Sequence, residues 1–222
     1  MASQDTNQSR RLTTSWWGDV KLALLTSWIG FWLLVGQLGF FAALGTIVQL
    51  KWRRLKGQPF AALPAPQSPR EAASRKQSAD AFVLYDVLST RLGADRAYAL
   101  VEQIVVEAGV RFMELVVPPI EKSEYDGLSD EERRAKLAGI AAGFPNIEVD
   151  GLQASAEVLS FNVVRCDFNQ LGEAIERTQV SPAFCACDAV FFEQKRPEVS
   201  FERPHTLSTG SPHCDFCFRW RT

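Results

Sequence analysis

The chain has 222 residues, a formal net charge of −2 and 11% aromatic residues. Because basic and acidic residues nearly balance, the charge excludes a broad basic surface and argues against nucleic acid as a partner. The length allows one domain of ordinary size and a short additional segment.

An uncharged stretch dominates the N-terminal part of the chain. Residues 22–50 contain no Asp, Glu, Lys, Arg or His, and a cluster of four basic residues follows within 51–56. A helix rises about 1.5 Å per residue, so a helix over this stretch is long enough to cross a hydrocarbon core of about 30 Å. The sequence therefore predicts one transmembrane helix over residues 22–50, after a polar tail over residues 1–21.

The flanks of this stretch predict a location. Basic residues directly after it favour a cytoplasmic C-terminal domain, and all five cysteines follow residue 165 in C-x-C and C-x-x-C spacings that are typical of reduced thiols. We expect a single-pass protein of the cell inner membrane, with the lipid bilayer as partner and the domain in the cytoplasm. Ser9-Arg10-Arg11-Leu12 can alternatively begin a twin-arginine export signal, which would place the domain on the other side.

Small residues mark one face of the expected span. Gly36, Gly39 and Ala43 are spaced i, i+3, i+7, and small residues let helix backbones approach closely. This face is a candidate for packing against another transmembrane helix of a larger complex. The alternative is that glycine is simply common in such helices.

A basic flank and a proline-rich linker are predicted over residues 51–76. Two helices should follow over 79–92 and 95–117, where apolar residues recur at intervals of three and four residues. Gly93 separates the two helices. Ser129 should cap a third helix that runs to about Ala142, because acidic residues fill its first turn.

The pattern changes to alternation after Pro145, and we expect strands over 156–166, 198–206 and 213–220. Short helices are expected over 168–179 and 181–192. Helices followed by strands predict an α+β fold for residues 77–222, with helices packed on an antiparallel sheet.

The last strand carries the first candidate site residue. Cys214 shares a face with Phe216 and Phe218, so its thiol should point to the covered side of the sheet, while His213 and Asp215 point away. A thiol beside a base or a helix N-terminus is partly ionised, and the thiolate is a nucleophile. The alternative is that each cysteine is a small core side chain.

Zinc is a competing interpretation of these cysteines. Cys185-x-Cys187 and Cys214-x-x-Cys217 are spaced like ligand pairs. On a strand, however, Cys214 and Cys217 point to opposite faces, whereas structural zinc sites place their pairs on turns. We therefore expect neither a metal nor another cofactor.

Several motifs together resemble the L-2-amino-thiazoline-4-carboxylic acid hydrolase family over roughly residues 80–220. They are Phe161-Asn-Val-Val-Arg-Cys166, Phe184-Cys-Ala-Cys-Asp188, Glu202-Arg-Pro-His-Thr-Leu207 and Gly210-Ser-Pro-His-Cys-Asp-Phe216, with Arg91-Leu-Gly-Ala-Asp-Arg-Ala97 in the helical region. The resemblance implies hydrolytic opening of a small thiazoline or cyclic amidine-type substrate, which yields a carbamoylated cysteine.

The resemblance also implies roles for individual residues. Cys214 or Cys185 would attack the ring carbon, and Asp188 or His213 would move the proton. Arg203 would hold a substrate carboxylate by a two-pronged contact, unless it only pairs with a nearby acid. The other substrate-binding candidates are Cys166, Thr206 and Asp215.

A second hypothesis comes from a different class of function. A family fold does not guarantee a retained activity, and a helix with a small-residue face can serve assembly. The chain would then be a non-catalytic accessory subunit of a membrane protein complex, docked through its transmembrane helix.

Overall fold

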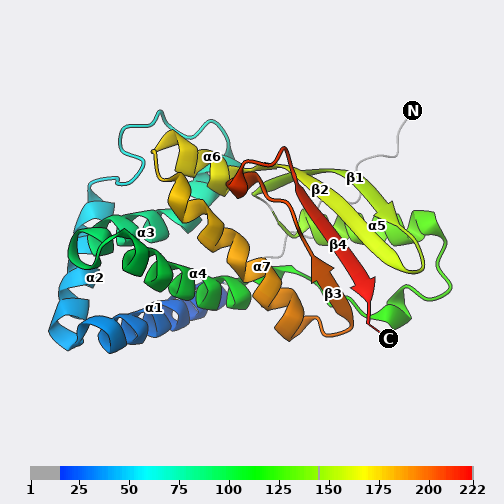
Figure 1. Ribbon diagram of the computed structural model, residues 1–222, viewed down its shortest axis with the longest axis horizontal. Coiled ribbons are helices and arrows are strands. Elements are labelled where there is room, and N and C mark those ends of the chain that lie inside the picture. The colour runs from blue at the N-terminus through cyan, green and yellow to red at the C-terminus, as the bar shows by residue number, and fades with distance from the viewer. Residues whose placement is uncertain (1–15, 145, 222) are drawn as a thin grey trace.

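The computed structural model describes residues 16–144 and 146–221. The helices are α1 (Trp16–Leu38), α2 (Phe40–Leu55), α3 (Pro69–Leu92), α4 (Ala94–Val116), α5 (Asp130–Ala142), α6 (Asp167–Ala174) and α7 (Ser181–Lys195), with short 3₁₀ turns η1 (Lys122–Glu124), η2 (Thr178–Val180) and η3 (Leu207–Thr209). The strands are β1 (Ile147–Ala154), β2 (Val158–Cys166), β3 (Val199–Glu202) and β4 (Cys214–Trp220). Helices α1 to α4 fill one end of the molecule, the sheet fills the other, and α7 runs between them (Figure 1). The α+β prediction is confirmed.

The apolar stretch forms two helices instead of one. Gly39 separates them with φ 78° and ψ 162°, a conformation that is essentially reserved for glycine. The chain turns there, so α2 runs at an angle to α1 (Figure 1). The prediction of a single transmembrane helix over residues 22–50 is therefore wrong. Across residues 16–144 and 146–221, we find no helix that combines the length and the apolar character that a membrane span requires.

The small residues of this segment do not form one face. Gly36 is exposed and Gly39 lies at the turn, but Ala43 is fully buried inside the protein. The buried side of α2 faces α3, where Arg91 donates a hydrogen bond to the Thr46 hydroxyl at 3.0 Å. The predicted packing stripe of Gly36, Gly39 and Ala43 is thus divided between surface, turn and core.

The N-terminal helices share a buried cluster with α3 and α4. Phe60, in the loop after α2, is buried against Phe82 of α3 with 6.1 Å between ring centroids. Helix α3 begins at Pro69, where the Ser68 hydroxyl accepts a hydrogen bond from the Glu71 amide. Residues 51–76 are therefore packed rather than a bare spacer. Residues 1–15 of the expected tail, with the twin-arginine sequence, lie outside the described residues.

The sheet is antiparallel with strand order β1-β2-β4-β3. Its paired central strands place Phe161 opposite Phe216 and Val163 opposite Cys214. Every second residue is buried on one face, as the alternation predicts; these are Leu159, Phe161 and Val163 of β2 and Cys214, Phe216 and Phe218 of β4. The opposite face of the two strands is only partly buried.

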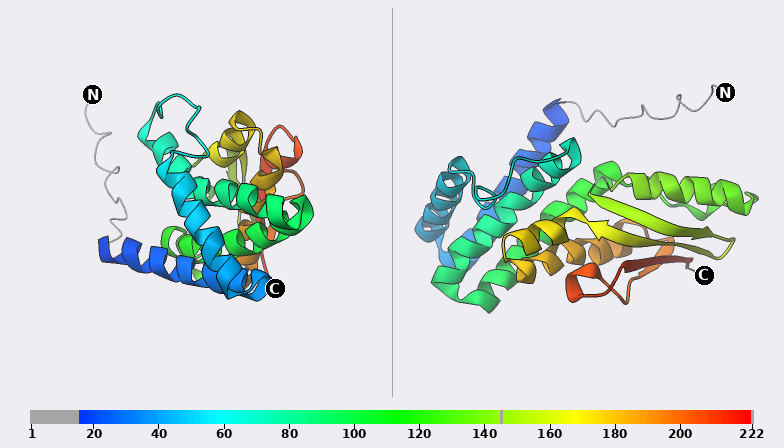
Figure 2. Two further views of the ribbon diagram at one scale, coloured as in Figure 1. Left: turned by 90° about the vertical axis from the view of Figure 1, so that its left-hand side faces the viewer. Right: turned by 90° about the horizontal axis from the view of Figure 1, so that it is seen from above.

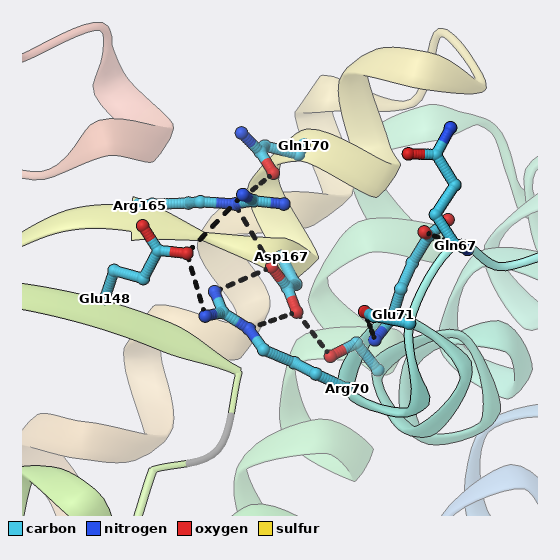
Figure 3. Close-up of polar contacts among 9 residues, drawn as sticks. Gln67, Arg70, Glu71, Glu148, Arg165, Asp167 and Gln170 are labelled. Atoms are coloured by element: carbon cyan, nitrogen blue, oxygen red, sulfur yellow. Dashed lines mark hydrogen bonds and ion pairs between the residues drawn. The ribbon is translucent and has the colours of Figure 1, made fainter.

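An ion cluster ties the start of α3 to the end of β2 (Figure 3). Arg70 donates to both carboxylate oxygens of Asp167, at 3.0 and 2.9 Å, and the Ser74 hydroxyl donates to the same carboxylate. Arg70 also donates to Glu148 of β1 at 3.0 Å. Asp167 is buried and directly follows Cys166. This group, which we call the Arg70 clasp, therefore fixes the backbone beside a candidate site residue.

Candidate active site

Arg203 and Asp188 form the centre of the candidate site. Arg203 follows β3, and its Nη1 makes an ion pair with Asp188 of α7. Its Nη2 donates to the Cys185 carbonyl at 2.9 Å, and the guanidinium lies over the Phe216 ring, 5.4 Å from the centroid. The two charged side chains are only 10% and 16% exposed. One buried arginine thus joins α7 to the edge of the sheet.

Burial shifts the pKa values of both members of this pair. It raises the pKa of Asp188 to about 6, and the facing guanidinium of Arg203 counteracts the rise. Burial also lowers the pKa of Arg203, but the Asp188 carboxylate outweighs this effect and leaves the pKa raised. The Nε of Arg203 is buried and has no hydrogen-bond partner among the described residues. The pair therefore contains a titratable acid and one unused donor.

Two of the predicted thiols, Cys185 and Cys214, contact the same short segment, η3. Burial raises the pKa of a third, Cys166, to about 12, although backbone hydrogen bonds from Asn169 and Phe168 oppose the rise. The Cys185 sulfur lies 3.5 Å from the Ser208 hydroxyl of η3. The Cys214 sulfur accepts a hydrogen bond from the Leu207 amide at 3.2 Å.

These thiols are protonated at neutral pH. Burial raises the pKa of Cys185 and of Cys214, although Arg203 opposes the rise in both. Burial thus opposes the partial ionisation that a neighbouring base or helix N-terminus would give a thiol. A nucleophilic role would need a base that takes the thiol proton during attack.

The other two cysteines lie apart from this group. Cys187 is buried against α4, with its sulfur 3.9 Å from the Met113 sulfur, and a Cβ at Gly109 would come within 2.9 Å of it. Cys217 lies on the opposite face of β4 from Cys214. The ligand pairs of the zinc interpretation are thus divided. Among the residues with described side chains, no three of His, Cys, Asp and Glu converge as metal ligands would.

Asp215 pairs with a histidine that the sequence interpretation left without a role. Its carboxylate lies 2.9 Å from His205 Nδ1 and accepts from the His205 amide at 2.8 Å. Partial burial raises the pKa of Asp215, but the bonds from His205 outweigh it, and the pKa is lowered. His213 is partly buried and forms no side-chain hydrogen bond within the described chain. Asp215 therefore pairs with His205 rather than with Arg203.

Three site residues were missed at the sequence level. The Tyr98 hydroxyl of α4 donates to Glu102 at 2.7 Å, and burial, Glu102 and the Cys185 thiol together raise the Tyr98 pKa. Ser208 bridges Cys185 to Thr206, whose hydroxyl is 3.0 Å away. The spacing of Tyr98 and Glu102 places them on one helix face, but only the fold brings that face to α7.

Two surface hollows, of about 240 and 360 Å³, are lined by residues other than those of the candidate site. The first borders Ser155 and Ser160, and the second lies between Arg53 and Arg177. Cys214 is buried beside Leu207 of η3, whereas Cys185 is partly exposed beside Ser208.

Comparison with known proteins identifies the family of the chain. The model of the L-2-amino-thiazoline-4-carboxylic acid hydrolase family matches residues 74–218. The chain belongs to the L-2-amino-thiazoline-4-carboxylic acid hydrolase family. This part of the chain contains Arg203, Asp188 and the thiols beside them, so the resemblance expected from the motifs is confirmed. None of the curated proteins matches the chain.

The family match begins inside α3. Helices α1 and α2 therefore lie outside the part matched by the L-2-amino-thiazoline-4-carboxylic acid hydrolase model, although they share a buried cluster with α3 and α4.

Proposed function

We propose that the chain is a hydrolase that opens a small thiazoline or related cyclic amidine ring. Family membership supplies the reaction class. The observation that carries the proposal is the buried Arg203, which pairs with Asp188, donates to the Cys185 carbonyl and keeps its own Nε without a partner among the described residues. Buried charges and unpaired donors are costly for a fold, and they are commonly retained where chemistry uses them.

Cys185 is the nucleophile in this proposal, because it is partly exposed whereas Cys214 is 5% exposed. Asp188 lies one turn along α7 and is ionised above about pH 6, so it takes the thiol proton. The sulfur bonds to the carbon between the ring nitrogen and the ring sulfur. The bond from that carbon to the ring sulfur breaks, and the departing sulfur takes up the proton that Asp188 received from Cys185. Water then attacks the same carbon and releases the thiol, so that the net reaction adds one water.

Arg203 has a narrower role than the motifs imply. Two of its nitrogens already contact Asp188 and the Cys185 carbonyl, so a two-pronged contact to a substrate carboxylate is not available in this arrangement. Its Nε can donate one hydrogen bond to a substrate oxygen. Thr206 orients Ser208, whose hydroxyl lies 3.5 Å from the Cys185 sulfur.

The burial of the thiols suits one alternative. A family member that kept the fold without turnover would tolerate thiols whose pKa values are raised by burial. Such a chain would act as a non-catalytic accessory subunit.

Turnover by the purified full chain distinguishes the two. We expect the chain to convert 2-amino-thiazoline-4-carboxylate to a carbamoylated cysteine, detected by liquid chromatography. Cys185→Ser should lower kcat by about hundredfold or more. Cys217→Ser is the matched control, because this thiol lies on the other face of β4, and it should leave kcat nearly unchanged.

Two results would contradict the proposal. Full activity in Cys185→Ser would exclude this residue as the nucleophile. No turnover by a folded wild-type chain would favour the accessory role.

A further inference from the structure

The outer corner formed by α1 and α2 exposes an unusual amount of apolar surface. Ten large apolar side chains are exposed among the residues with described side chains, and eight of them lie on these two helices. They are Trp28, Trp32, Phe40, Phe41, Leu44, Val48, Trp52 and Leu55, which together we call the apolar corner. Figure 2 shows that α1 and α2 lie at the periphery, at the end of the molecule away from the sheet. Such a concentration is typical of an interaction surface.

Helix α2 is apolar on both sides. Ala43, Thr46 and Leu50 are buried toward the protein's own core. Phe41 and Leu55 are 85% and 83% exposed on the opposite side. The exposed apolar residues between them recur at intervals of three and four residues. A water-exposed helix face normally carries polar residues, so the outer face of α2 is built for an apolar environment.

The aromatic residues connect the two helices across the turn. Trp28 and Trp32 lie 5.7 Å apart between ring centroids on α1. Phe31 of α1 contacts Phe40 of α2 at 5.9 Å, and Phe40 contacts Phe41 at 5.6 Å. The exposed rings therefore form one continuous surface around Gly39.

Positive charge borders the far end of this surface. Lys51 and Lys56 are exposed, and the Lys56 ammonium lies 4.5 Å from the centroid of the Trp52 ring. Residues 22–56 contain no Asp or Glu. Tryptophan with adjacent lysine and arginine is the side-chain combination found where proteins contact lipid headgroups. The charge is complementary to an anionic membrane surface.

We propose that the apolar corner docks on the surface of a bilayer that contains anionic lipid. The exposed rings and aliphatic side chains enter the boundary between headgroups and acyl chains. Arg53 and Lys56 contact lipid phosphates, whereas Arg54 and Lys51 pair with Asp80. Lipid fits better than a protein partner, because the corner offers apolar area without the polar groups that a specific protein interface would hydrogen-bond. The cytoplasmic leaflet expected from the flanking charges stays a prediction. The docking is independent of the hydrolase proposal.

Cosedimentation of the full chain with vesicles tests the docking. We expect binding to vesicles of phosphatidylcholine mixed with phosphatidylglycerol and weaker binding to phosphatidylcholine alone. Phe41→Asp and Leu55→Asp should each weaken binding by about tenfold or more, because each removes a large apolar side chain from the lipid contact. Leu115→Asp is the matched control: Leu115 is 48% exposed on α4, outside the corner, and its substitution should not change binding.

The same variants distinguish docking on lipid from docking on a second copy of the chain. All three positions are exposed, so far-ultraviolet circular dichroism should show an unchanged fold. Equal binding of Phe41→Asp, Leu55→Asp and the wild type to mixed vesicles would overturn the proposal. So would light scattering that shows a wild-type dimer, a monomeric Leu55→Asp variant and no binding of either to vesicles, because the corner would then contact a second copy.

Discussion

At the scale of single residues, Asp188 is the most informative side chain. It is an acid that faces an arginine, yet burial raises its pKa to about 6. An acid with this pKa is mostly ionised at neutral pH and can still accept a proton from a thiol. The position of Asp188 therefore suits the base role better than that of His213, which lacks a hydrogen-bonded partner among the described residues.

Asp188 also predicts how stability depends on pH. The fold raises its pKa above the ordinary value of 3.8, so the folded state holds the proton more tightly than the unfolded state. Its contribution is present at low pH and is lost as pH rises from about 4 to about 6. Relative to Asp188→Asn, the unfolding free energy of the wild type should fall by about 2 to 3 kcal/mol over that window. Urea unfolding at several pH values measures this difference, and a rise instead of a fall would mean that Arg203 controls the titration.

Individual site residues could be found from the sequence only in part. The motifs assigned Cys185, Asp188 and Arg203 to one site, and the structure joins the three through the Arg203 side chain. The motifs implied a substrate carboxylate as the partner of Arg203, whereas its partner is Asp188, which lies 15 positions away. The alternation of residues along a strand cannot show which acidic side chain of another element lies beside the end of that strand. The pairing of His205 with Asp215 was missed for the same reason.

At the scale of elements, the Arg70 clasp connects α3, β1 and the junction between β2 and α6. The Asp167 side chain is 4% exposed, so its charge depends on Arg70 and Ser74. Arg165 adds a longer contact to Asp167, at 3.5 Å. The Arg70 clasp fixes the end of β2 that carries Cys166 (Figure 3). None of the residues of the clasp is among the proposed catalytic residues.

Removing Arg70 should therefore destabilise the whole fold. We expect Arg70→Ala to lower the unfolding free energy by on the order of 3 kcal/mol, because a buried carboxylate loses its principal partner. Lys136→Ala is a suitable comparison, since it breaks an exposed pair with Glu124 and should cost about 1 kcal/mol or less. Chemical denaturation of both variants measures the difference. Equal losses would mean that the clasp is no stronger than a surface ion pair.

Elements with a strong repeating pattern could be predicted, and irregular ones could not. Period-two alternation located β2 and β4, and Ser129 forms the expected cap of α5, with a reciprocal bond from Glu132. Strand β1 was missed because two register shifts and Gly151, with φ 60°, interrupt its alternation. The break at Gly39 was missed because apolar composition carries no information about a single backbone angle.

At the scale of the molecule, the N-terminal helices are part of the fold. Leu34 and Leu50 are 1% and 6% exposed in the cluster that also contains Phe82 and Leu88. The family match starts at residue 74, yet this cluster extends to α1 and α2. The matched part alone would therefore expose apolar surface that the full chain buries.

A chain that begins at residue 69 tests this dependence. We expect it to lose several kcal/mol of unfolding free energy or to aggregate, because each large buried side chain contributes about 1.5 to 3 kcal/mol. Urea unfolding followed by circular dichroism, with the full chain alongside, measures the loss. The same unfolding midpoint in both chains would show that α3 to β4 fold without the N-terminal helices.

The angle between α1 and α2 depends on Gly39, because only a residue without a side chain readily adopts its backbone conformation. Any L-amino acid at this position would be strained at φ 78° and ψ 162°. A methyl group at residue 39 would meet no neighbouring atom, yet it would oppose the turn that brings the aromatic residues of α1 and α2 together.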